Sequence, residues 1–224
     1  MATRTPPASP AAGSPDDEPD IRSIEIPQLD VRQAILHVVG ISPLIMHRWS
    51  EKAAKALEDA QTGKAKQQKA PRVPEEEFVA AAYIIAGKEE EPDWQPGKYY
   101  FPSTAFKHAF LYGVSQLGDV KTMPKTKATG WVYVDADPVL DFERVELRTD
   151  IGRNPTQPIY RPYFFNWSCD LQVGYNGRTI SLEQVVSLFD LGGFSGGIGE
   201  WRPSSPKNKS GSFGRFRVER VTGE

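Results

Sequence analysis

An α+β fold is predicted for this chain of 224 residues by three observations. Some segments alternate between apolar and polar residues, which is typical of strands, and others place apolar residues every three or four positions, which is typical of helices. These segments follow one another in the order strand, helices, strands, helix, strand. Hydrophobic residues make up 39% of the chain, enough for a sizeable core. One globular domain with an N-terminal tail is the organisation we expect.

Residues 1–30 differ from the rest in composition. Up to about Asp20 they are rich in Pro, Ala, Ser and acidic residues and contain almost no large apolar side chains. Burial therefore cannot offset the entropy lost on ordering, and we expect a disordered acidic and proline-rich tail. Two arginines against six carboxylates give this tail a charge of −4, which leaves +2 for the other residues, since the net charge is −2. Those other residues, 31–224, are expected to form the domain.

The first part of the domain is predicted to contain a strand and two helices. Residues 33–39 alternate in polarity and are followed by Gly-Ile-Ser-Pro, so they form the first strand, with His37 as a packed or hydrogen-bonded core residue. Residues 50–60 can form a helix. Pro74 and the three glutamates after it favour the N-terminus of a second helix.

A third helix and two strands are expected next. The helix spans residues 103–116 and is capped by Ser103 or Thr104, because a hydroxyl can accept from the amides of the first turn. Residues 131–134 and 140–147 read as two strands separated by an Asp-Pro turn. Residues after them alternate strictly, which predicts a strand with one buried side. Its span is residues 166–175, with Trp167, Cys169, Leu171, Val173 and Tyr175 on the buried side.

The last elements are a helix and a strand. Ser181 and Gln184 form a capping box for a helix over residues 182–191, and Gly192 is placed to end that helix in the left-handed conformation. Residues 213–218 form the final strand. The whole order is compatible with a ferredoxin-like (RRM-like) β-α-β-β-α-β core that carries insertions and a C-terminal glycine-rich loop.

The composition excludes several classes of protein. The one cysteine, Cys169, rules out an internal disulfide framework and fits a reducing cytoplasm. Three scattered histidines lack the spacing of a zinc site. No apolar run approaches the ~20 residues that span a bilayer, and the N-terminus lacks the layout of a signal peptide. We therefore expect a cytoplasmic protein with no cofactor, metal or membrane partner.

The segment from Gly192 to Val218 is dense in glycine and ends on a basic strand. Its glycines permit positive φ and close approach to the backbone, so we expect bare amides that face a phosphate chain. Six basic residues against two glutamates between positions 192 and 220 give a local charge of +4. Phe213 is expected on the same strand face as Arg215 and Arg217, an arrangement that holds single strands by stacking and charge. The segment lacks the Gly-Lys-Ser/Thr of a nucleotide-hydrolysing loop, so nucleic acid is the expected ligand.

Three short stretches resemble one known family. Residues 197–202 read GIGEWR, residues 210–216 read SGSFGRF, and residues 100–110 read YFPSTAFKHAF. The first two resemble the C-terminal glycine-rich loop of the RAMP superfamily (repeat-associated mysterious proteins), which includes subunits of CRISPR effector complexes. The third is similar to the strand-to-helix step of that superfamily, although His108 stands where the family usually has Gly. The resemblance implies a ferredoxin-like core and neighbouring copies along a bound guide strand.

Two histidines are weak candidates for catalysis, His47 after the first strand and His108 beside Lys107 on the third helix. The resemblance implies that the region after the first strand contacts RNA. In processing endoribonucleases of the superfamily, a histidine there can act as general base on a 2′-hydroxyl. No motif fixes that role to His47. The alternative is structural, with Trp49 packed under the following helix and Arg48 in solvent.

The sequence therefore predicts a non-catalytic RNA-binding subunit of a CRISPR-like ribonucleoprotein, which grips a guide strand and assembles along it with copies of itself and other subunits. Two alternatives stay open: a metal-independent endoribonuclease that processes RNA, and a protein that coats or anneals single-stranded DNA. The expected nucleic-acid contacts are Gly196, Gly197, Gly199, Trp201, Arg202, Lys207, Lys209, Phe213, Arg215, Arg217, Lys107, His47 and Arg48.

Overall fold

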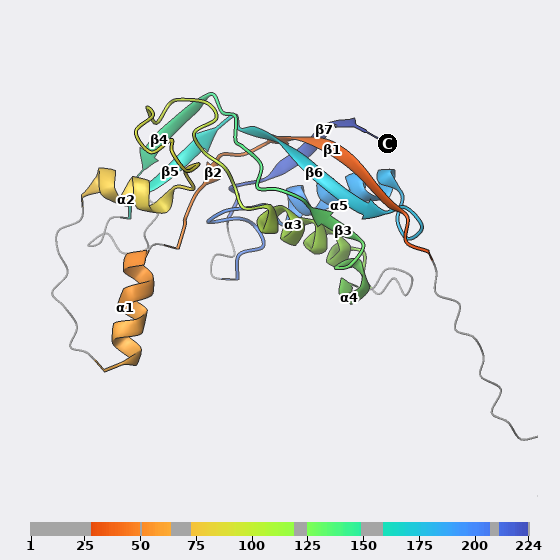
Figure 1. Ribbon diagram of the computed structural model, residues 1–224, viewed down its shortest axis with the longest axis horizontal. Coiled ribbons are helices and arrows are strands. Elements are labelled where there is room, and N and C mark those ends of the chain that lie inside the picture. The colour runs from red at the N-terminus through yellow and green to blue at the C-terminus, as the bar shows by residue number, and fades with distance from the viewer. Residues whose placement is uncertain are drawn as a thin grey trace, which may run out of the picture.

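The computed structural model describes residues 28–49, 51–63, 73–118, 125–148, 159–206 and 211–223, with the backbone alone at 51–53, 56, 60, 125 and 126. The described chain is α+β, with two antiparallel sheets and helices beside them (Figure 1). The strands are β1 (Val31–Gly40), β2 (Leu44–Ile45), β3 (Val132–Val134), β4 (Arg144–Arg148), β5 (Arg161–Phe165), β6 (Ser168–Asn176) and β7 (Phe216–Thr222). The helices are α1 (Glu51–Gln61), α2 (Pro74–Ala81), α3 (Ser103–Gln116), α4 (Lys125–Ala128) and α5 (Leu182–Ser195). Of the predicted tail, residues 1–27 lie outside the described residues.

One sheet has four strands in the order β3-β6-β1-β7. The strands β1 and β6 form its centre, and the alternation of their side chains decides which face is buried. Leu36 pairs with Leu171 and Val38 with Cys169, and all four side chains are buried. The predictions of the first strand and of the alternating strand with one buried side are confirmed.

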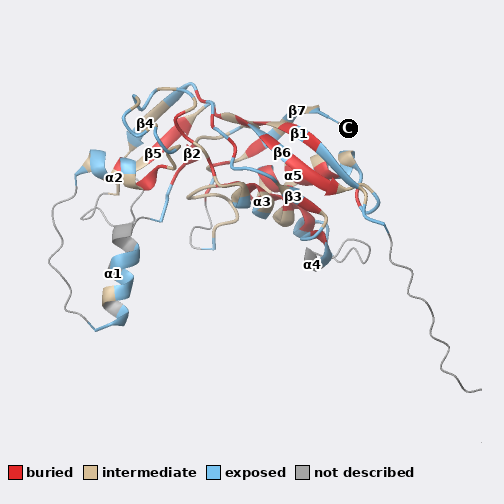
Figure 2. Cartoon of the chain, viewed as in Figure 1, coloured by how far each residue is buried: buried red, intermediate tan, exposed pale blue. Residues whose placement is uncertain are grey.

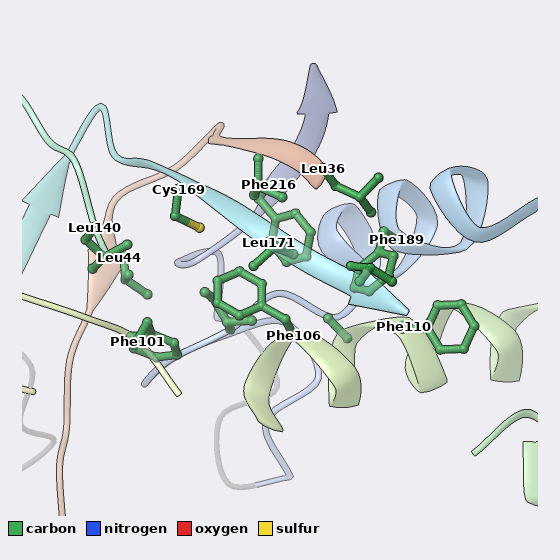
Figure 3. Packing of buried hydrophobic residues seen from close by; sticks show 14 of the residues in the cluster. Leu36, Leu44, Phe101, Phe106, Phe110, Leu140, Cys169, Leu171, Phe189 and Phe216 are labelled. Atoms are coloured by element: carbon green, nitrogen blue, oxygen red, sulfur yellow. The ribbon is translucent and has the colours of Figure 1, made fainter. Parts of the chain in front are cut away.

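Helices α3 and α5 cover the buried face of this sheet, and Figure 2 shows the buried residues gathered between them and the strands. Phe106 and Phe110 project from α3 into this layer (Figure 3). The ring of Phe106 lies 5.7 Å from that of Phe216, and the ring of Phe110 lies 5.2 Å from that of Phe189. Large aromatic side chains therefore supply much of the core.

The two helices approach each other through glycines. A Cβ on Gly192 would lie 1.8 Å from the carbonyl oxygen of Ala109, and a Cβ on Gly113 would lie 2.3 Å from that of Leu188. The prediction that Gly192 ends its helix is wrong, because α5 continues to Ser195. Close packing against α3, and not a turn, is what requires glycine at this position.

The N-termini of α5 and α3 are satisfied in different ways. At α5 the predicted capping box is confirmed: the Gln184 amide donates to Ser181 Oγ at 3.3 Å, and the Ser181 amide donates to Gln184 Oε1 at 3.0 Å. At α3 the prediction of a cap by Ser103 or Thr104 is wrong. The Ser103 amide donates instead to the carboxylate of Asp137 at 2.7 Å, across 34 positions of sequence.

The opposite face of the four-stranded sheet carries exposed and half-buried residues. His37 lies on this face, where its Nδ1 is 2.7 Å from Asp170 Oδ1. The prediction of a core histidine is therefore wrong, although the residue is hydrogen-bonded. Strand alternation places His37 on the other face of the sheet from the buried Leu36. Tyr133 covers Gly174, at which a Cβ would lie 2.1 Å from the ring Cζ.

A second sheet joins three strands in the order β2-β5-β4. The sequence did not predict β5, and β4 occupies only the end of the strand predicted at residues 140–147. Phe164 of β5 belongs to the main core, whereas Tyr163 packs with Ile45 in a second, smaller hydrophobic cluster. The two faces of β5 therefore contact different parts of the molecule.

The final strand begins three residues later than predicted, at Phe216. Gly214 has φ of 65°, and a Cβ there would lie 1.8 Å from the carbonyl oxygen of Ile198. Only glycine fits this position, and its left-handed conformation turns the chain before the strand starts. Within the described residues, no helix has the length and apolar character needed to cross a bilayer.

Candidate functional site

A pocket of roughly 690 Å³ lies between the segment after α5 and the N-terminal half of α3. Residues 197–202 of the glycine-rich segment line one side, and Thr104, Ala105 and His108 of α3 line another. Two of the three stretches that carry the family resemblance thus meet at one pocket, although they lie far apart in sequence. The remaining lining residues are His47, Tyr83, Phe101, Pro102, Ala109, Leu111, Tyr112, Ser204 and Ser205.

The glycine-rich segment is closely packed. The amides of Gly196 and Gly197 donate to the carbonyl oxygen of Gly192, and the Glu200 amide donates to that of Ile45 at 3.0 Å. These amides are not bare, so the expected row of free donors is wrong at these positions. The glycines instead allow backbone segments to approach one another, which makes this segment a packed wall of the pocket.

A cluster of three charged or titratable side chains lies at this wall. His47 Nδ1 is 3.2 Å from Glu200 Oε1, and Arg161 Nε donates to Glu200 Oε2 at 2.9 Å. Arg161 Nη2 is 3.0 Å from His47 Nε2, so each side chain contacts both others. With its proton on Nδ1, the neutral imidazole donates to Glu200 and accepts from Arg161. Neither ring nitrogen is then free to take a proton from a ligand.

The Glu200 carboxylate holds this cluster together. Burial raises the pKa of its carboxyl group, but hydrogen bonds and charge contacts with His47 and Arg161 lower that pKa by more, so the net pKa lies below its usual value. The group is therefore ionised at neutral pH and neutralises Arg161, whose side chain is only 13% exposed. Arg161 thus holds the Glu200 side chain in place at this wall of the pocket.

Trp201 and Arg202 are half-buried at the turn of the glycine-rich segment, and both line the pocket. Trp201 has φ of 57°, which is uncommon for a residue other than glycine, and its ring packs on the second hydrophobic cluster. Arg202 Nη1 donates to the carbonyl oxygen of Gly199 at 3.0 Å. Its guanidinium group is therefore held in place beside the pocket.

The two basic candidates on α3 differ in position. His108 is exposed and lines the pocket, whereas Lys107 is half-buried and is not part of its lining. Of these two side chains, His108 is therefore the one that a ligand in the pocket can contact.

Phe213, Arg215 and Arg217 do not share one face, contrary to the prediction. The Phe213 ring meets that of Tyr163 edge-on at 5.7 Å. Arg215 lies 4.9 Å over the ring of Phe194 and donates to the carbonyl oxygen of that residue at 2.7 Å. Arg217 lies exposed on β7, where it forms an ion pair with a neighbouring glutamate. The turn at Gly214 separates Phe213 from the two arginines, and Arg215 and Arg217 have different partners.

Arg48 and Trp49 are exposed and are not part of the pocket lining. Trp49 is 65% exposed, so the expected packing of its ring under the following helix is wrong. Lys207 and Lys209 lie outside the described residues.

Sequence reasoning missed two arginines of β4. The guanidinium groups of Arg144 and Arg148 lie 4.3 Å and 5.2 Å from the ring centre of Phe165. The alternation Arg-Val-Glu-Leu-Arg was an available signal, because it puts three charged residues on one strand face. The neighbouring strand β5, which supplies the ring, has no such alternation and could not be predicted from it.

The described side chains differ in the chemistry that they can offer. Burial, with a smaller effect from the charge of Asp170, raises the pKa of the Cys169 thiol, which keeps it protonated and unreactive. The described part of the chain brings no three of its His, Cys, Asp and Glu residues together as metal ligands. What the pocket does offer is aromatic rings, a fixed guanidinium group and an exposed imidazole.

No protein-family model and no curated protein matches this chain. Among solved structures, it is similar to the crystal structure of Cmr6 from Pyrococcus furiosus, with a TM-score of 0.38 and 11% sequence identity. The match covers 86% of this chain and 100% of that one. A likeness at this level leaves the function to be inferred from the site itself.

Proposed function

We propose that this protein binds single-stranded RNA at the pocket between its glycine-rich segment and α3, without cutting it. The observation that carries the proposal is the meeting of residues 100–110 and 197–202, two stretches with RAMP-like sequence, around one pocket. Tyr112 and Trp201 offer rings on which bases can stack. The exposed imidazole of His108 can donate a hydrogen bond to a phosphate oxygen.

A ferredoxin-like core is part of this proposal. The elements β1, α3, β3, β6, α5 and β7 follow one another as β-α-β-β-α-β. The antiparallel strand order β3-β6-β1-β7, with both helices on one face, supports that assignment. The remaining elements are then insertions, and two of these insertions together supply the strands of the three-stranded sheet.

We propose further that the protein is a guide-strand-gripping subunit of a CRISPR-like ribonucleoprotein in the cytoplasm. Its RAMP-like stretches support this role. Copies of the chain would follow one another head to tail along the strand, together with other subunits. Such heterologous contacts give an open filament and not a closed ring.

The contacts of His47 favour binding over an endoribonuclease activity. Both of its ring nitrogens are engaged by Glu200 and Arg161. A general base needs a free lone pair within reach of the 2′-hydroxyl. The exposed His108 is therefore the histidine whose substitution tests for RNA cleavage.

The binding experiment uses fluorescence anisotropy with labelled RNA and DNA oligonucleotides of the same sequence, in EDTA and at several salt concentrations. We expect the protein to bind RNA more tightly than DNA and to leave the RNA uncut. The affinity should fall as salt rises, because phosphate contacts release counterions. Equal affinity for both strands would favour the single-stranded DNA-coating alternative, since discrimination needs contact with the 2′-hydroxyl. RNA cleavage that is lost in His108→Ala would support the endoribonuclease.

The decisive variant is Thr104→Glu, which puts a negative charge into the pocket. A carboxylate in the first turn of α3 interacts favourably with the helix dipole, so the variant should fold normally. It should weaken RNA binding about tenfold, because the new charge repels phosphate. The control Ser187→Glu adds the same charge to an exposed position of α5 outside the pocket lining. If both variants bind like the wild type, or if the wild type binds no strand at low salt, the proposal is wrong.

A further inference from the structure

We infer that the bound strand continues beyond the pocket onto the β4 edge of the three-stranded sheet, where Arg144, Arg148 and Phe165 hold it. This inference rests on the proposed function, because it extends the path of the same nucleic-acid strand.

Strand register places these residues together. Arg144 pairs with Phe165, and Arg148 pairs with Arg161, across the antiparallel strands β4 and β5. Directly opposed residues lie on the same face of a sheet. The Glu146–Tyr163 pair lies between them on that face. Cations and aromatic rings therefore alternate across one small surface.

The arginines are stacked on the rings. The guanidinium carbon of Arg144 lies 4.3 Å from the ring centre of Phe165, and that of Arg148 lies 5.2 Å from the ring centres of Phe165 and Tyr163. A stacked guanidinium group is a flat surface with N–H donors at its edges. The flat side suits a base, and the edges suit phosphate oxygens.

The charge on this face is positive and open to solvent. The carboxylate of Glu146 is shared by both arginines, at 2.8 Å from Arg144 Nε and 3.2 Å from Arg148 Nε. One negative charge thus faces two positive charges. The side chains of Arg144 and Arg148 are 55% and 42% exposed. A polyanion would complete the neutralisation that Glu146 begins.

This face is continuous with the pocket. Trp201 lines the pocket and also packs on the hydrophobic cluster that contains Tyr163. Glu200 lines the pocket as well, and it is paired with Arg161 of β5. A strand that leaves the pocket beside Trp201 can therefore follow this face of β5 to the exposed arginines of β4.

The experiment compares short and long RNA. Oligonucleotides of about 4 and about 16 nucleotides bracket the site sizes of single-strand-binding folds. The variant Arg144→Gln/Arg148→Gln removes both charges but keeps side chains that can cover Phe165. The control Lys127→Gln/Arg178→Gln removes two exposed charges, one on α4 and one in the turn after β6. Figure 1 shows α4 at the end of the molecule away from the three-stranded sheet.

The expected result is a loss confined to the long strand. Wild type and control bind the long RNA more tightly than the short one, and Arg144→Gln/Arg148→Gln loses about tenfold on the long RNA alone. Its salt slope for the long RNA falls by about 1.4, because each single-strand phosphate contact contributes about 0.7. Glu146→Gln binds the long RNA more tightly than the wild type, a gain that misfolding could not produce.

Other results overturn the inference. Unchanged binding of long RNA by Arg144→Gln/Arg148→Gln refutes it but leaves the pocket proposal intact. Equal weakening on short and long RNA shows that the face is not a separate part of the path. If polyglutamate displaces the long RNA as effectively as unlabelled RNA does, the face is a surface for an acidic protein segment, and the inference is wrong. Failure of the wild type to bind either RNA refutes the inference and the proposed function together.

Discussion

At the scale of single residues, glycine determines how closely the two core helices pack. Gly192 lies against the backbone of Ala109, so any side chain at this position meets a carbonyl oxygen that cannot move aside without shifting α3. Such overpacking costs more than a change at a flexible neighbour.

We predict that Gly192→Ala lowers the free energy of unfolding by about 3 kcal/mol, at the upper end of overpacking costs. Urea unfolding followed by circular dichroism measures the change. Gly130→Ala is the matched control, because a Cβ there would lie 3.7 Å from its nearest neighbour, an ordinary contact. A loss for Gly192→Ala no larger than for the control would contradict the close helix packing.

Glu200 is a second residue whose role is testable. We predict that Glu200→Gln lowers the free energy of unfolding by about 2 kcal/mol at neutral pH, because it leaves the half-buried Arg161 without a charged partner. The carboxyl pKa is depressed in the folded protein, so this stabilisation is present above the unfolded pKa and disappears as pH falls through the lower, folded value. The difference between wild type and variant should therefore shrink below about pH 4.3. Urea titrations from pH 7 to acid measure it, and a pH-independent difference would refute the ion pair.

The residues that sequence could predict are those whose role depends on near neighbours. Alternation placed Leu171 and Cys169 correctly inside β6, because the period of a strand is local. The contact of His47 with Arg161 joins positions 114 apart, and no local pattern contains it. Gly192 was recognised as special, but the cause lay in another helix.

At the scale of secondary structure, α3 illustrates how a distant residue completes an element. Its first amide is satisfied by Asp137, which also brings a negative charge to the positive end of the helix dipole. The segment that follows β3 and the start of α3 are thereby tied together.

We expect Asp137→Ala to destabilise the protein by about 1 kcal/mol, as for loss of an N-terminal cap. Asp137→Asn should recover part of this loss, because the amide oxygen still accepts but carries no charge. Asp135→Ala, an exposed carboxylate two positions earlier, serves as the control. Thermal unfolding of the four proteins gives the comparison, and equal melting temperatures would show that Asp137 does not cap α3.

Elements were predicted well where one pattern dominated and poorly where two competed. The capping box located the start of α5 because both partners lie within one turn. The strand β5 was missed because Arg-Pro-Tyr-Phe-Phe has inward residues on both faces, one set in each hydrophobic cluster. Such a strand lacks the alternation by which sequence reveals half-buried strands.

At the scale of the whole molecule, the sequence identified the two stretches that line the pocket but not their geometry. The glycine-rich segment was predicted to bind through its backbone, whereas its amides are largely engaged at the positions discussed above. Side chains from α3 and from the turn of that segment form the accessible surface instead.

Assembly is the property to test at this scale. If copies of the chain line up along RNA, the sedimentation coefficient of the complex should rise in steps with strand length, while the protein without RNA sediments as one copy. Analytical ultracentrifugation measures both states. Thr104→Glu, which is expected to bind RNA about tenfold more weakly, should need about a tenfold higher protein concentration to reach the same steps. One copy per strand regardless of length would contradict the filament.

The glycine contact between α3 and α5 also has a kinetic consequence. Because the two helices touch backbone to backbone, the N-terminal half of α3 and the segment that follows α5 are attached to one packed unit. The pocket is then already formed when a strand arrives, so little ordering precedes binding. Association should be fast and steered by charge, and variants of the pocket should differ mainly in how long the strand stays bound.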